Sequence, residues 1–250
     1  MILFGKKKAL QALLDEKNVD LWNFVDRNYK VSIKLYNGNI YGAKKKDKKV
    51  VMFVPKKYLK SSLFTHELLH LKINVYANIG LVIFLASKDH APLNIIFNYT
   101  NSLLMGNLIE HAIMYNEYMK LGYDEEGFVC DYLDDKFTDL DKKKIKEISY
   151  TIFDLENLFF YISKYIVLKS VREKDRNYGH ALEYMREVNS NLYDIMEKFY
   201  NNILLNFSVD LEQLGDSYVY TIGEMLESVL DLYGGNLLQE INKLNSSGIK

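Results

Sequence analysis

The residues best suited to chemistry lie in one short segment, Thr65-His66-Glu67-Leu68-Leu69-His70. His66 and His70 are four residues apart, so on a helix both rings lie on one face and can bind one metal ion. Glu67 lies beside that ion without binding it, where its carboxylate can accept a proton from an activated water molecule. Zinc fits this chemistry because it lowers the pKa of a bound water to about 7. The segment therefore predicts zinc-dependent hydrolysis with Glu67 as the general base.

The sequence around this segment predicts the helix that it needs. From Ser61 onward Phe64, Leu68 and Leu71 follow helical spacing on one broad stripe. Ser61 or Ser62 is expected to cap the start of this helix, which runs on towards Gly80.

A small sheet is predicted before that helix. Apolar residues alternate with polar ones over Val31–Leu35, the pattern of a half-buried strand. Asn37-Gly38 is a strong hairpin signal, so Ile40–Ala43 is expected to be the return strand. Lys44–Lys49 is predicted to be a solvated turn, and Val50–Val54 to be a third strand.

The rest of the chain is predicted to be helical. Lys6–Asn28 indicates one or two short helices, and Asn98–Leu121 one long helix with Gly122 as its C-terminal stop. Beyond Asp131 the apolar residues keep helical spacing. The expected fold is α+β and predominantly α, with a small antiparallel or mixed sheet over the HExxH helix. We expect a core over residues 1–125 and a helical lobe over 126–250, or one continuous domain.

In these features the chain resembles the zincin metallopeptidases, in which a small sheet packs over a helix bearing HExxH. The order of Val31–Leu35, Ile40–Ala43, Val50–Val54 and THELLH carries the resemblance, which covers about residues 30–125. It implies a zinc peptidase whose sheet edge aligns a peptide substrate. The chain departs from the family at Lys72, where zincins usually have an apolar residue.

The third metal ligand decides the subclass. The metzincin motif needs Gly at position 73 and His at 76, but the chain has Ile73 and Tyr76, which excludes that subclass. Gluzincin-like enzymes take a glutamate from a later helix, and this chain offers Glu110 and His111 side by side. Consecutive residues point about 100° apart on a helix, so a regular helix directs only one of them at a given ion.

The two candidates are favoured by different arguments. His111 lies about 40° from the apolar centre of its helix and Glu110 about 140°, so periodicity favours His111. The resemblance to gluzincins favours Glu110. Both stay open, and the residue that does not bind metal is expected to support the site through a hydrogen bond or an ion pair.

Other residues are weaker candidates. Zincins often stabilise the oxyanion of the tetrahedral intermediate with a His or Tyr from outside the motif, and the resemblance offers Tyr178 or His180 for this role. A local role in a loop or helix cap is the alternative for both. His90 lies in a polar loop and is a further candidate ligand.

Composition restricts the partners and the compartment. The net charge is -1, and a protein built to bind nucleic acid normally has a basic excess, so we expect no nucleic-acid partner. The apolar, uncharged run Ile73–Ser87 has 15 residues, and a membrane span needs about 20, so we expect no membrane. One cysteine, Cys130, and an N-terminus without the order of a signal peptide favour the cytoplasm.

The sequence therefore supports two hypotheses. The first is a zinc metallopeptidase that acts on a peptide or protein substrate. The second is a non-catalytic zinc-binding scaffold whose helical half binds a partner protein. An open coordination position separates them, because structural zinc usually has four protein ligands. The chain can supply four protein ligands only if the later helix is distorted. Both Glu110 and His111 would then have to point at the ion that His66 and His70 bind.

Overall fold

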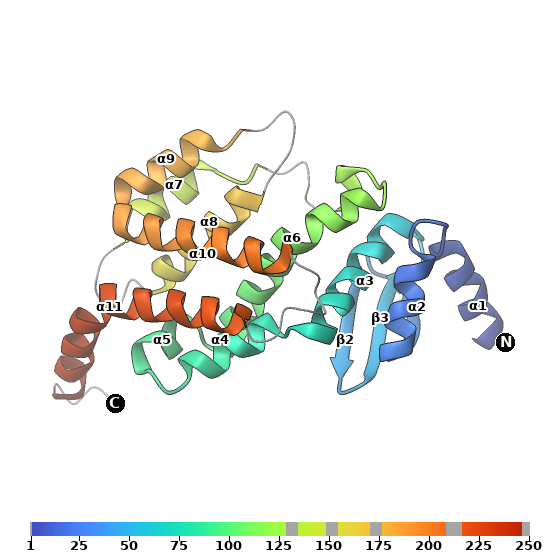
Figure 1. Ribbon diagram of the computed structural model, residues 1–250, viewed down its shortest axis with the longest axis horizontal. Coiled ribbons are helices and arrows are strands. Elements are labelled where there is room, and N and C mark those ends of the chain that lie inside the picture. The colour runs from blue at the N-terminus through green and yellow to red at the C-terminus, as the bar shows by residue number, and fades with distance from the viewer. Residues whose placement is uncertain (1, 129–134, 149–154, 171–176, 209–216, 247–250) are drawn as a thin grey trace. The chain divides into compact units, whose positions relative to one another are not determined.

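The computed structural model describes residues 2–128, 135–148, 155–170, 177–208 and 217–246 (Figure 1). The contacts within the chain divide it into two compact units. Met1–Ala77 and Ile113–Asp134 form the first, and Asn78–Ala112 and Asp135–Lys250 form the second. The first unit ends near the boundary expected after residue 125, but residues 78–112 group with the second unit.

The fold class expected from the sequence is confirmed. The described residues are predominantly helical and contain one small mixed sheet of three strands. This sheet belongs to the first unit, together with helices α1 (Ile2–Leu13), α2 (Val19–Asn28) and α3 (Ser61–Tyr76). The helices expected over Lys6–Asn28 correspond to α1 and α2.

The strands are β1 (Lys30–Tyr36), β2 (Gly42–Lys46) and β3 (Lys49–Pro55). Their order in the sheet is β1-β3-β2, with β3 parallel to β1 and antiparallel to β2. The strands predicted over residues 31–35 and 50–54 are therefore confirmed.

The predicted hairpin between the first two strands is wrong. The segment after Asn37-Gly38 leads to the opposite edge of the sheet, because β1 pairs in parallel with β3. The hairpin joins β2 to β3 instead, with Asp47 in the left-handed region at φ 54°. Aspartate tolerates this conformation better than most residues, which suits it to the turn. The lysine run is exposed as predicted, but its first three residues belong to β2.

The inner face of the sheet and the helices of the first unit share one core. Ile33, Met52 and Val54 are buried on the sheet, and Phe64 and Leu68 are buried on α3. Aromatic pairs hold α2 against α3: the Trp22 and Phe64 ring centroids are 5.8 Å apart, and those of Phe24 and Tyr76 are 5.9 Å apart.

Helix α3 begins and ends differently from the prediction. No side-chain cap is present, because Ser61 is already the first helical residue and follows Lys60. The helix stops at Tyr76 since Ala77 is extended, with φ −143° and ψ 127°. It therefore does not run on towards Gly80; the next helix, α4 (Ile79–Ser87), begins after Asn78, whose side chain accepts a hydrogen bond from the Leu81 amide.

Helix α6 (Tyr99–Lys120) is the long helix that the sequence predicted. It stops where Gly122 adopts φ +80°, a conformation that glycine reaches without steric cost. The predicted glycine stop is therefore confirmed.

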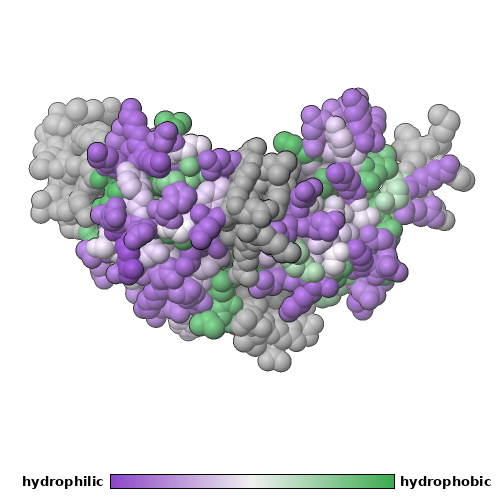
Figure 2. Space-filling model, turned by 90° about the horizontal axis from the view of Figure 1, so that it is seen from above, coloured by the Kyte–Doolittle hydropathy of each residue, from purple (hydrophilic) through white to green (hydrophobic). Residues whose placement is uncertain are grey.

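The second unit is a helical assembly. Besides α4 and the first turns of α6 it contains α5 (Ala91–Ile96), α7 (Asp139–Lys146), α8 (Leu155–Ser170), α9 (Gly179–Val188), α10 (Ser190–Ser208) and α11 (Ser217–Ser246). Buried tyrosines link these helices: Tyr161 donates to the Met185 carbonyl, and the Asn189 amide donates to Tyr233. Figure 2 shows hydrophilic residues over most of the visible surface, as expected for helices that bury one face.

Among the described residues, no single helix is both long enough and apolar enough to cross a membrane. The consecutive helices α3 and α4 pass that test of length and composition only when they are taken together.

A polar contact joins the start of α7 to α8. Thr138 and Asp141 form a reciprocal capping box, and Lys164 of α8 lies 3.1 Å from the Asp141 carboxylate. Burial alone raises the pKa of Asp141, but hydrogen bonds from Thr138 and the charge of Lys164 outweigh it and lower the pKa below the ordinary 3.8.

Asp141→Asn is therefore expected to lower the free energy of unfolding at neutral pH by about 1–2 kcal/mol, through the weakened cap and the lost ion pair. Because the folded-state pKa is depressed, this contribution is complete above pH 3.8 and declines as the pH falls below it. Urea unfolding of both proteins from pH 7 downward measures the difference. A difference that stays constant below pH 3.8 contradicts this assignment.

Candidate metal centre

Helix α3 places His66 and His70 one turn apart, with their imidazoles facing each other. The two Nε2 atoms are 3.1 Å apart, and the ring planes meet at 70°. Two nitrogens bound tetrahedrally to one zinc ion at about 2.0–2.1 Å would be roughly 3.3 Å apart. The pair therefore already has nearly the separation that a shared ion requires.

Helix α6 brings a third imidazole to this pair. One ligand nitrogen from each of His66, His70 and His111 lies within 4.8 Å of the other two. His66 is buried, whereas His70 and His111 are half-buried, so the cluster is open to solvent on part of its surface.

Glu110 does not belong to this cluster of the described residues, although its side chain is buried, with 7% exposed. Periodicity placed it on the polar side of the helix, and that expectation about its burial is wrong. Helix α6 buries residues on several sides, among them Ile109, Ala112 and Met114, so its single apolar direction carries little information.

The position of His111 follows from the course of α6. The boundary between the two units falls directly after Ala112, but the helix is continuous there. Its following turns belong to the first unit, as does α3. His111 therefore lies on the helix whose next turns belong to the first unit.

Lys72 explains the departure from the zincin pattern. Its ammonium group forms an ion pair with the Glu117 carboxylate of α6, and both side chains are partly exposed. An apolar residue at position 72 could not form this link. This ion pair links α3 to α6. Lys72 lies two residues after His70 on α3, and Glu117 lies six residues after His111 on α6.

Phe128 forms an aromatic wall beside His66. Their ring centroids are 5.1 Å apart, and Phe128 also packs edge-on against Tyr115 and Tyr118 of α6. The chain can approach this closely because Gly127 precedes Phe128: a Cβ there would lie 2.8 Å from the Cβ of Ser62. This contact restricts the orientation of the His66 ring.

A buried polar network fixes α3 just before His66. The fully buried Asn18 donates to Thr65 Oγ1 at 3.0 Å and to the Leu13 carbonyl at 2.9 Å. Asn18 Oδ1 accepts from the Asp15 amide, and Asp15 accepts from the Tyr123 hydroxyl at 2.7 Å. The α1–α2 connection, α3 and the segment after α6 are thus held together.

The surroundings of Glu67 shift the pKa of its carboxyl upward. Burial raises the pKa of its carboxyl, and the charge of His70 pulls it partly back. A bound divalent cation would lower that pKa further, since it stabilises the carboxylate.

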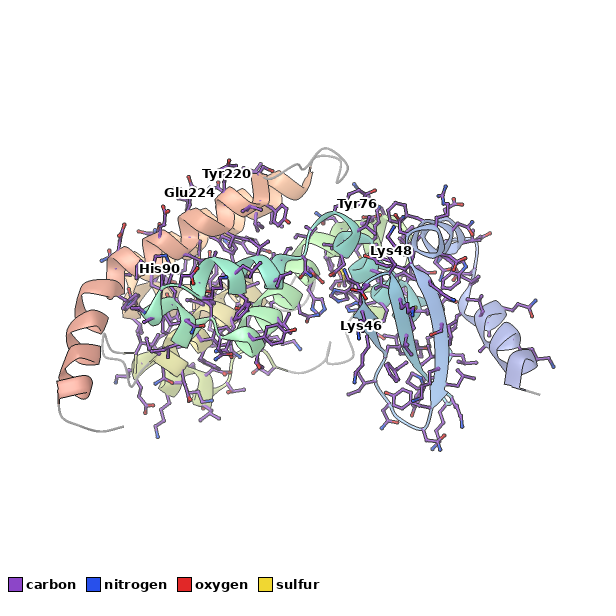
Figure 3. The ribbon with its side chains drawn as sticks, turned by 90° about the horizontal axis from the view of Figure 1, so that it is seen from below. Lys46, Lys48, Tyr76, His90, Tyr220 and Glu224 are labelled. Atoms are coloured by element: carbon purple, nitrogen blue, oxygen red, sulfur yellow. The ribbon has the colours of Figure 1, made fainter. Side chains whose placement is uncertain are left out.

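The remaining candidates lie outside the three-histidine cluster. Tyr178 is buried, and its hydroxyl accepts from the Lys136 amide and donates to Asp135. His180 is exposed and lies 6.2 Å from the Phe137 ring. His90 is exposed at the start of α5 (Figure 3). A role for Tyr178 or His180 at an oxyanion stays a prediction.

Comparison with other proteins does not assign this site. No protein-family model matches the chain, and neither a curated protein nor a solved structure is significantly similar to it. The chemistry of the site therefore has to be argued from its own residues.

Sequence reasoning missed three supports of the site: Phe128, the Asn18–Thr65 contact and the Lys72–Glu117 pair. The first two left no local pattern, because each joins segments that are distant in the sequence. Lys72 did leave a signal, since a lysine in a mostly apolar stretch requires a partner or solvent.

Lys72→Met is expected to weaken zinc binding about two- to fivefold, because the loss of a partly exposed ion pair loosens the hold of α3 on α6. Competition with a chromophoric chelator measures the affinity. Lys120→Met, at the exposed end of α6, is the matched control. Equal affinities of the two variants would show that the pair does not position the site.

Proposed function

We propose that this chain is a zinc-dependent metallopeptidase in which His66, His70 and His111 hold the ion and Glu67 is the general base. The observation that carries the proposal is the approach of His111 to the HExxH pair, with the three nitrogens within 4.8 Å. A chance pair of helical histidines gives no reason for a third imidazole to lie there.

The donor set supports zinc with a position left for reactants. Three imidazole nitrogens suit zinc, and three protein ligands are the usual number in catalytic zinc sites. When bound, zinc supplies a Lewis acid that makes water nucleophilic near neutral pH. The half-buried His70 and His111 leave room for water and substrate on one side.

Glu67 carries the proton transfers. Its carboxylate accepts a proton from the attacking water and later gives it to the leaving amine, so the residue ends the cycle as it began. Its position next to His66 supports this exchange, because the motif keeps the base beside the ion without making it a ligand.

A peptide substrate is supported by the resemblance to zincins and by the sheet. Strand β2 is an edge strand and runs antiparallel to β3. The outer side of an edge strand offers backbone groups that an extended peptide can pair with. We place this activity in the cytoplasm, in agreement with the single cysteine of the chain.

The alternative is a closed structural zinc site in a scaffold protein. That site needs a fourth protein ligand, and Glu110 is the residue that the sequence offers for it. The cluster of the described residues contains His111 without Glu110, which favours the open, hydrolytic site.

Glu67→Gln is expected to retain zinc and to lower peptide hydrolysis about 10²- to 10⁴-fold, since it removes the base without removing a ligand. Cleavage of a fluorescence-quenched peptide library, with the zinc content measured on the same sample, tests this.

The matched control is Glu126→Gln, which changes an exposed glutamate and is expected to leave hydrolysis unchanged. If Glu67→Gln holds zinc and cleaves the library as fast as the wild type, Glu67 is not the base. If the wild type holds zinc and cleaves nothing, the scaffold alternative replaces the proposal.

A further inference from the structure

Positive charge is concentrated in one segment of the chain. Residues 30–60 contain ten lysines and one acidic residue, Asp47. The other 219 residues contain 22 basic and 32 acidic side chains. A net charge of -1 therefore combines a segment of net charge +9 with a remainder of −10. Such asymmetry points to a partner of opposite charge.

The lysines of this segment share the outer face of the sheet. Side chains alternate along a strand, and Ile33, Met52 and Val54 point to the buried side. The register then places a set of exposed lysines on the opposite side: Lys30, Lys34, Lys44, Lys46 and Lys49. These five residues are called the basic face below. Figure 3 labels Lys46 beside the β2–β3 turn.

Aromatic rings lie at the centre of the basic face. Phe53 is on the middle strand, opposite Lys34 in the register, and its ring meets that of Tyr36 edge-on at 6.2 Å. The ammonium groups of Lys34 and Lys44 lie 5.4 Å and 5.9 Å from the centre of the Phe53 ring. Both rings are half-buried and so remain partly accessible.

Nothing in the described part of the chain neutralises these charges. None of the five lysines forms an ion pair with a described carboxylate. Lys34 and Lys44 rest on Phe53 through exposed cation–π contacts, which are weak and easily exchanged. The basic face thus offers free cations around an aromatic centre.

We propose that the basic face binds single-stranded nucleic acid. The lysines contact phosphates, and Phe53 and Tyr36 stack with unpaired bases, the combination that sequence-tolerant single-strand binders use. Lys34 and Lys44 leave the Phe53 ring for phosphates as a base takes their place. In a duplex the base faces are stacked on one another, so Phe53 cannot stack on them.

Other polyanions fit the basic face less well. An anionic membrane favours surfaces whose apolar side chains project into the lipid, but Phe53 and Tyr36 are half-buried and do not project beyond the lysines. An acidic peptide would pair with the lysines and leave the rings unused. The whole-chain net charge argues against nucleic acid only if charge is spread evenly, and here it is not.

Fluorescence anisotropy of the full chain with a labelled oligothymidylate of about 20 nucleotides tests the proposal. We expect salt-dependent binding, with log Kd rising by up to about 3.5 per decade of salt if five phosphates are contacted. The pair Lys34→Gln and Lys44→Gln is expected to reduce that slope by about 1.4. Phe53→Leu is expected to weaken binding about fivefold or more, and Phe53→Trp to preserve it.

The pair Lys143→Gln and Lys146→Gln removes the same charge from exposed sites on α7 and is expected to leave binding unchanged. Three results would overturn the proposal: no binding at low salt, an equal effect of the α7 pair, or tighter binding to polyglutamate or to phosphatidylserine vesicles. If Phe53→Leu does not fold, quenching of the indole in Phe53→Trp by the oligonucleotide decides, and its absence also overturns the proposal.

Discussion

The proposed zinc site, with zinc–nitrogen bonds of about 2.0–2.1 Å, requires that its two helices be fixed to within a fraction of an ångström. The distance between His66 and His70 meets this requirement locally, because a regular helix fixes the separation of residues four apart. The third imidazole comes from α6, and its distance depends on how α6 is held against α3. Most of the polar and aromatic contacts near the site serve this one requirement.

The contacts that hold the helices act at different points. The Asn18–Thr65 hydrogen bond fixes α3 on the N-terminal side of His66, and the Lys72–Glu117 pair links it to α6 on the C-terminal side of His70. Phe128 covers the His66 ring between them. The site therefore has supporting contacts on the N-terminal side of His66, beside the His66 ring and on the C-terminal side of His70. The chemistry proposed for Glu67 depends on that support.

The sequence predicted those parts of the molecule that local patterns encode. Period-two alternation predicted β1, a short apolar run closed by Pro55 predicted β3, and helical spacing predicted α3, while Gly122 predicted the end of α6. Strand pairing was not predictable in this way, because the parallel partner of β1 is chosen by a buried face that Ile33 and Met52 share across the sheet. The Asn37-Gly38 signal marked a break after β1 but not a hairpin, which lies at Asp47 instead.

The site shows the same limit. The motif predicts two candidate ligands and a candidate base because their spacing is local. The third candidate ligand required a choice between adjacent residues. Because α6 is buried on several sides, the spacing of its apolar residues did not show which of the two faces the site. Glu110 is buried against the expectation, while His111 joins the cluster. The basic face was likewise hidden in the sequence, since its lysines come together only through the pairing of three strands.

Metal analysis of matched variants tests the central claim most directly. Elemental analysis of the purified wild type should find about one zinc per chain, and His70→Ala and His111→Ala should each lose most of it. Glu110→Gln and the exposed His90→Ala should keep it. Zinc that survives His111→Ala but is lost from Glu110→Gln would contradict the three-histidine site, and a wild type without metal even after zinc is supplied would contradict the metal centre itself.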